Sequence, residues 1–118
     1  MGATGAGHLS KALASNTTLQ SLNLTGNKMG ATGAGHLSKA LASNTTLQSL
    51  ILASNNMGDT GAGQLLTALQ SNQGLKELYI FFNQLSEKMK AQAKQVEQHK
   101  QEGTEGYHQV EGMKILAC

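Results

Sequence analysis

The chain has 118 residues, enough for one domain, and its nine lysines against seven acidic residues give a formal net charge of +2. It has no arginine and its lysines are scattered, so we expect no nucleic-acid surface; the single cysteine, Cys118, excludes an internal disulfide and fits a reducing compartment. No apolar run approaches the roughly 20 residues of a membrane span, and no signal peptide is visible, so we expect a cytoplasmic protein without membrane contact.

An internal repeat dominates the chain. Residues 29–50 repeat residues 1–22 letter for letter, as MGATGAGHLSKALASNTTLQSL, and a diverged third copy begins at Met57. The period is 28 residues, which is typical of a solenoid in which each unit packs only on its neighbours. Stacked units form an extended recognition surface and no single enclosed pocket, so the period favours a binding function.

Each unit reads as a short strand followed by a helix, and residues 19–46 show the pattern. Leu22 and Leu24 alternate with polar neighbours, which predicts a half-buried strand, and Asn27 is placed to bond the backbone of the next turn. Gly30 and Gly33 permit a tight turn and close packing. The helix after them carries an apolar stripe, predicted to face the core in all three copies: Ala6, Leu9, Ala12 and Leu13; Ala34, Leu37, Ala40 and Leu41; Ala62, Leu65, Ala68 and Leu69.

The segment after the third unit departs from the pattern. Residues 86–102 have Ser86 and Met89 in the places of the turn glycines, but they keep apolar residues at helical spacing. Their other positions are rich in Lys, Glu and Gln. We expect a longer, more polar helix there, of the kind that caps a solenoid end.

The last nine residues fit the strand pattern again. Val110 opens the match, Met113 and Ile115 take the inward strand positions, and Cys118 takes the position that ends the strand. Val110 lies 35 residues after Leu75, which is seven more than the period and equals about two helical turns. We expect a fourth strand there, with a frayed tail as the alternative.

The repeated motif LxxLxLxxN followed by GxxGAxxLxxALxxNxxL resembles the ribonuclease-inhibitor-like subtype of leucine-rich repeat, over residues 1–85. The subtype also occurs in NOD-like receptors and Ran GTPase-activating protein. The resemblance implies an α/β solenoid, a horseshoe segment of about four helix–strand units with parallel strands concave and helices convex. It implies one domain over 1–118, with the repeats in 1–85 and a cap in 86–118. It gives function only as a class, that of protein-interaction modules.

Candidate chemical sites are few. The segments GATGAG (2–7 and 30–35) and GDTGAG (58–63) match neither the dinucleotide fingerprint nor a P-loop, and they indicate turns. His8 and His36 lie one period apart, but no further metal-ligating residue joins them in register. We therefore predict no catalytic residue, no metal, no cofactor and no enzyme activity.

The outward strand positions form the candidate binding surface. They line up in three columns: Asn23, Ile51, Tyr79 and Lys114; Thr25, Ala53, Phe81 and Leu116; Gly26, Ser54, Phe82 and Ala117. Small polar residues give way to aromatic ones along these columns. We predict a protein partner here, with Ile51, Tyr79, Phe81 and Phe82 in contact and Lys76 and Glu77 giving polar orientation. The alternatives are that the cap covers Phe81 and Phe82, or that Phe82 turns inward.

Two further hypotheses remain open. The first copy starts at its helix, with no strand or polar cap before it, so its apolar edge would be unpaired. The chain would then be an array segment that self-associates into a homo-oligomer through this edge. The other hypothesis is a regulator of a GTPase or signalling protein, for which no residue set in the chain gives a specific prediction.

Overall fold

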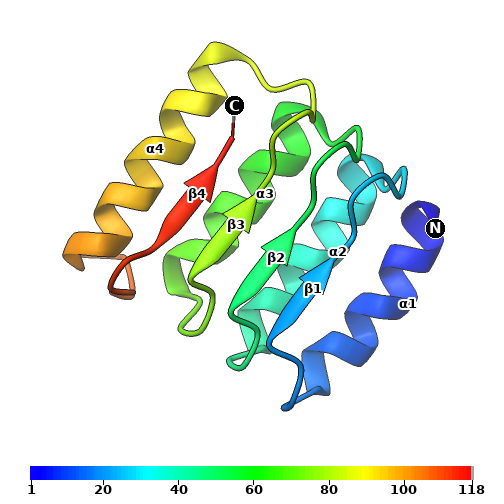
Figure 1. Cartoon of the computed structure of the whole chain (residues 1–118), viewed down its shortest axis with the longest axis horizontal. Coiled ribbons are helices and arrows are strands. Elements are labelled where there is room, and N and C mark those ends of the chain that lie inside the picture. The colour runs from blue at the N-terminus through cyan, green and yellow to red at the C-terminus, as the bar shows by residue number, and fades with distance from the viewer. Residues whose placement is uncertain (118) are drawn as a thin grey trace.

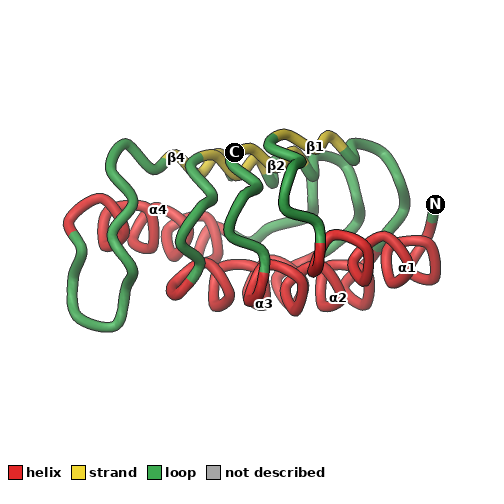
Figure 2. The backbone as a smooth tube through the Cα atoms, turned by 90° about the horizontal axis from the view of Figure 1, so that it is seen from below, coloured by secondary structure: helices red, strands yellow, loops and turns green. Residues whose placement is uncertain are grey.

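The computed structural model describes residues 1–117 and shows two layers, with strands along one side and helices along the other (Figures 1 and 2). Over these residues, four helices alternate with four strands. The helices are α1 (Gly2–Ser15), α2 (Gly30–Ser43), α3 (Gly58–Ser71) and α4 (Glu87–Glu102). The strands are β1 (Ser21–Asn23), β2 (Ser49–Ile51), β3 (Glu77–Tyr79) and β4 (Lys114–Leu116). This confirms the predicted α/β solenoid of about four units.

The strands form one parallel sheet in the order β1-β2-β3-β4. The inward residues lie in register from strand to strand: Leu22, Leu50, Leu78 and Ile115. They contribute to the core together with the helical stripe, which in α2 is fully buried at all four predicted positions.

The register predicted for β4 is wrong by two residues. Ile115, not Met113, pairs with Leu78, so that Lys114 lies opposite Glu77 and Leu116 opposite Tyr79. The reason is a turn before the strand: the Val110 N–H donates to the Lys100 carbonyl and the Met113 N–H to the Val110 carbonyl. Val110 and Met113 are buried in that turn. A shift of two keeps Lys114, Ile115 and Leu116 on their predicted faces. Ala117, predicted on the outward surface, is instead buried. Cys118, predicted to end the strand, lies outside the described residues.

Because two units have identical residues, differences in burial between them must come from the units beside them and not from their own sequence. Leu19 is 37 % exposed, whereas its copy Leu47 is 1 % exposed. Ala12 is exposed, whereas Ala40 is buried. The second copy is covered by the first, and no described residue covers the first copy on that side. Burial in this fold is therefore set by the adjacent unit, as expected of a solenoid.

Glycines allow the first three helices to approach closely. A Cβ atom at Gly61 would lie 3.1 Å from the Cβ of Ala34, and one at Gly33 would lie 3.3 Å from the Cβ of Ala6. Both distances are shorter than an ordinary carbon–carbon contact, so a larger residue would push the helices apart.

A first ladder of asparagines joins the units where the strands end. The Asn27 N–H donates to Asn55 Oδ1 (2.9 Å), and the Asn55 N–H donates to Asn83 Oδ1 (2.8 Å). Each side-chain amide also donates to carbonyls: Asn55 Nδ2 lies 2.9 Å from the Leu24 oxygen and 3.0 Å from the Leu52 oxygen. This confirms the backbone-bonding role predicted for Asn27, and it shows that the bonds also cross between units.

A second ladder joins the units where the helices end. Asn44 Nδ2 donates to the carbonyl of Asn16, and Asn72 Nδ2 to that of Asn44, each 28 residues earlier. The same amides also donate to Leu13 and Leu41 in the last turns of the preceding helices, both at 2.8 Å. The C-terminal carbonyls of a helix have no partner within it, so these bonds supply what the helix itself lacks.

Lys100 continues this ladder in place of an asparagine. It follows Asn72 by the same 28 residues, and its Nζ donates to the carbonyls of Leu69 (2.6 Å) and Asn72 (2.7 Å). The first three helices end just before their asparagine, whereas α4 runs on past Lys100 to Glu102. The lysine side chain reaches these two carbonyls from inside α4, and its ammonium group satisfies the end of α3.

We expect the buried Lys100 to make stability depend on pH. The side chain is 0 % exposed, and burial lowers its pKa to about 8 from 10.5. Between these two values the unfolded chain binds more protons than the folded one, so the free energy of unfolding should rise with pH, by up to about 1 kcal/mol per pH unit. Urea unfolding from pH 7.5 to 10 measures this. Lys100→Met should remove the slope and the exposed Lys94→Met should keep it; a flat wild-type profile would contradict the assignment.

Candidate functional site

The outward surface of the sheet, which we call the strand face, carries most of the predicted contact residues. Ile51 and Tyr79 are directly paired on β2 and β3, and both are half-buried. Phe81 and Phe82 follow β3 and extend the surface beyond the end of the sheet. The structure therefore brings the apolar members of the predicted set together.

The three aromatic rings form a continuous cluster. The ring centroids of Tyr79 and Phe81 are 6.3 Å apart, and those of Phe81 and Phe82 are 5.1 Å apart in an edge-to-face arrangement of 86°. These separations are those of favourable aromatic pairs. The Tyr79 hydroxyl donates to Glu77 Oε2 at 3.3 Å, which orients the tyrosine along the strand face.

Phe82 is the least covered member of this cluster, at 74 % exposed. The alternatives in which the cap covers it, or in which it turns inward, are therefore wrong; Phe81 is half-buried. Phe82 also has a φ of +59°, in the left-handed region. The equivalent positions are Gly26 and Ser54, also with positive φ, so the turn imposes this conformation on whatever residue stands there. A bulky side chain in this region costs about 1–2 kcal/mol.

Lys76 lies apart from the aromatic cluster. It lines a shallow depression of about 560 Å³ at the start of the strands, together with Glu77, Lys114 and the polar side chains Gln20, Gln48 and Ser49. The Lys114 N–H donates to the Lys76 carbonyl at 2.8 Å, which holds the first residue of β4 beside the residue that precedes β3. The predicted site is thus two regions, one polar and one aromatic, and the Glu77–Tyr79 hydrogen bond connects them.

Lys114 and Leu116 lie on this surface, as the columns predict, but at other register positions. The predicted register puts Lys114 beside Tyr79 and Leu116 beside Phe81, whereas each lies two residues nearer the start of β3. Leu116 therefore extends the apolar surface next to Tyr79, and it is 37 % exposed. The apolar pair Val110 and Met113 has the same spacing as Leu75 and Leu78, but it forms a buried turn and not the start of a strand.

Within residues 1–117, no three His, Cys, Asp or Glu side chains lie close enough together to hold a metal ion. In the same part of the chain, no helix is long and apolar enough to cross a membrane.

The fold and the strand face define an α/β solenoid whose units are joined edge to edge. Residues 15–38 and 43–66 each match the model of a family described as Leucine Rich repeat, and the two matches begin one 28-residue period apart. No curated protein matches the chain. The chain is a leucine-rich repeat protein. Repeats of this family generally mediate protein–protein interaction and are typically not enzymes.

We expect the Phe82 side chain to be dispensable for folding. Phe82→Asn should leave the free energy of unfolding unchanged or raise it by up to about 1 kcal/mol. Asparagine tolerates a positive φ, and the relief of backbone strain offsets the loss of the contact between the aromatic rings. Phe81→Asn, at a half-buried position without positive φ, should instead lower it by about 1–2 kcal/mol. Urea unfolding of both variants measures the difference. A loss above 1 kcal/mol at Phe82 would show that its ring is part of the fold.

Proposed function

We propose that the chain binds a protein partner through its strand face. Tyr79, Phe81 and Phe82 are the apolar anchors, with Ile51 beside them on the neighbouring strand. Lys76 and Glu77 give polar orientation at the other end of the surface. The 28-residue unit with a full α-helix supports the ribonuclease-inhibitor-like subtype, in which we place the repeats.

The exposure and backbone of Phe82 carry this proposal. Its ring is largely in water and its backbone is in a region that disfavours a large side chain, so the residue adds little to folding. The chain has two Phe and two Tyr residues, and three of these four gather in this one cluster. Binding sites favour aromatic residues that are exposed in the free protein and become buried in the complex.

The proposal predicts a selective loss of binding. Immobilised wild type, the double variant Tyr79→Ala with Phe81→Ala, and Phe82→Asn are compared for the proteins they capture from a cell extract, using quantitative mass spectrometry. A partner of the strand face should fall at least about tenfold with both variants, because truncating an anchor costs on the order of 2 kcal/mol. Leu19→Ala, a matched apolar truncation at the N-terminal edge, should leave capture unchanged. Partners that persist with both strand-face variants would contradict the proposal.

A second candidate function is self-association through the N-terminal edge. Two observations favour it: the apolar side chains Met1 (48 %) and Leu19 (37 %) are exposed there, and the sequence copy of the same surface is buried against another unit. A surface whose duplicate packs in this way has the shape and composition of an interface.

Light scattering over a concentration series tests this second candidate. Self-association through the edge predicts a mass above that of the monomer in wild type and in Phe82→Asn, and a monomer mass in Leu19→Lys, where a charge replaces the exposed leucine. A wild-type mass that stays at that of the monomer at every concentration would exclude self-association and leave the strand face as the site to probe.

A further inference from the structure

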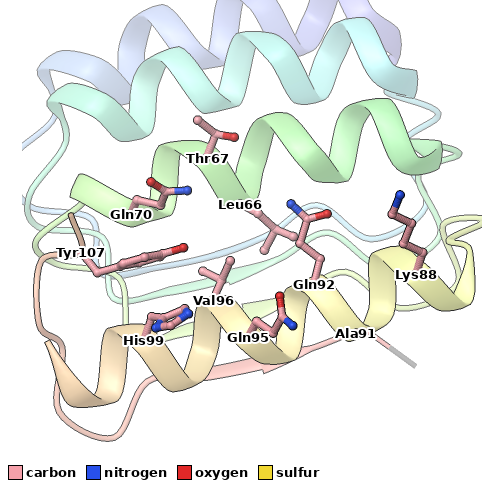
Figure 3. A pocket seen from close by; sticks show the side chains of 10 residues that line it. All are labelled: Leu66, Thr67, Gln70, Lys88, Ala91, Gln92, Gln95, Val96, His99 and Tyr107. Carbon is pink, nitrogen blue, oxygen red and sulfur yellow. The ribbon is translucent and has the colours of Figure 1, made fainter. Parts of the chain in front are cut away.

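A groove separates α3 from α4 on the helical side of the molecule, away from the strand face (Figure 3). Its volume is about 310 Å³, at the small end of ligand sites. The buried side chains of Leu66 and Val96 form its floor. The groove is open along its length, and residues of both helices line it.

The groove arises where the repeat motif is lost. Between the first three helices, Gly33 and Gly61 allow contact at the level of the helix backbones. In α4 the equivalent residue is Met89, which reaches toward Gly63 of α3, where an added Cβ would lie 3.7 Å from its methyl carbon. A methionine side chain between the helices holds them apart, and the space along them remains open.

The walls carry side-chain amides that the fold does not use. Gln70 comes from α3, and Gln92 and Gln95 come from α4. None of these side chains takes part in a hydrogen bond within residues 1–117, whereas Gln98 and Gln101, which do not line the groove, both do. A carboxamide donates and accepts at once, which matches the N–H and C=O of a peptide backbone.

The two ends of the groove differ in character (Figure 3). Tyr107 stacks on His99 at one end, with centroids 4.8 Å apart and planes at 24°, and its hydroxyl points into the groove. Lys88 lies at the other end. Along α4 from Lys88 to His99 the rise is about 16 Å, which an extended peptide of about five residues would span.

Lys88 has no carboxylate partner within residues 1–117. Its neighbour Glu87 lies 3.4 Å from Lys90 instead. Asp59, at the start of α3, accepts hydrogen bonds from the N–H (2.9 Å) and hydroxyl (2.6 Å) of Ser86, and these bonds lower the pKa of its carboxyl group. The nearby acids are thus engaged elsewhere, and Lys88 is free to meet a carboxylate from outside.

We propose that this groove binds a short extended peptide segment of a partner protein, with an acidic group at the Lys88 end. The glutamine amides pair with the peptide backbone, and an apolar side chain lies over Leu66 and Val96 toward Tyr107. The site is separate from the strand face and does not depend on the function proposed there.

The test is a selection from a displayed random heptapeptide library on the full chain carrying Phe82→Asn and Phe81→Ala, which disables the strand face. Enriched peptides should carry Asp or Glu at one end. Ala91→Trp, an exposed position that lines the groove, should weaken their binding at least tenfold by filling it. Lys94→Trp, at an exposed position of the same helix that does not line the groove, should not.

Charge reversal provides an independent reading that does not rest on filling the groove. Lys88→Glu should weaken the enriched peptides at least tenfold, whereas Lys94→Glu, exposed on α4 outside the groove, should change binding less than twofold. Failure to enrich any peptide, or peptides indifferent to both Ala91→Trp and Lys88→Glu, would overturn the proposal. Dimerisation of the chain that Ala91→Trp abolishes would assign the groove to a second copy and would also overturn it.

Discussion

The unpaired carbonyl at the end of each helix and strand is the constraint on which this structure depends. Asparagine side chains of the following unit satisfy these groups, so each unit is completed by its neighbour. The bonding residues must therefore recur at the same interval as the units themselves, at Asn16, Asn44, Asn72 and Lys100. Buried amides that lose their partners are costly, which makes the 28-residue spacing much harder to change than the identity of an exposed residue.

The unit itself could be predicted from the sequence because its signals are local and repeated. Alternating leucines and the helical stripe each appear three times. The structure confirms the sheet and, in α2, the buried helix face, whereas Ala12 in the stripe of α1 is exposed. Lys100 could not be recognised as a ladder residue, because a lysine in a polar helix is normally exposed. Its only signal was its distance from Asn72, which gains meaning once the asparagine bonds are known.

The candidate site was predicted in composition but not in arrangement. Tyr79, Phe81 and Phe82 lie within and just after the strand of the third unit, so the repeat pattern predicts that they are close together, and the structure confirms it. Positions on β4 depended on how the chain turns after α4, where no copy of the unit supplies a register. The backbone of Phe82 was equally hidden, since its positive φ comes from the turn and not from phenylalanine.

The exact duplication has a thermodynamic consequence of its own. Because α1 and α2 have the same sequence, α3 would meet an identical helix surface if it packed on α1 with residues 29–56 looped out. Complementarity between helix side chains does not distinguish this slipped frame from the native one, although in the strand layer Tyr79 would face Asn23 in place of Ile51. In the helix layer, what distinguishes the two frames is the free energy of one complete inter-unit interface, together with the entropy of closing the loop. The helices thus select their frame by the number of interfaces formed and not by their specificity.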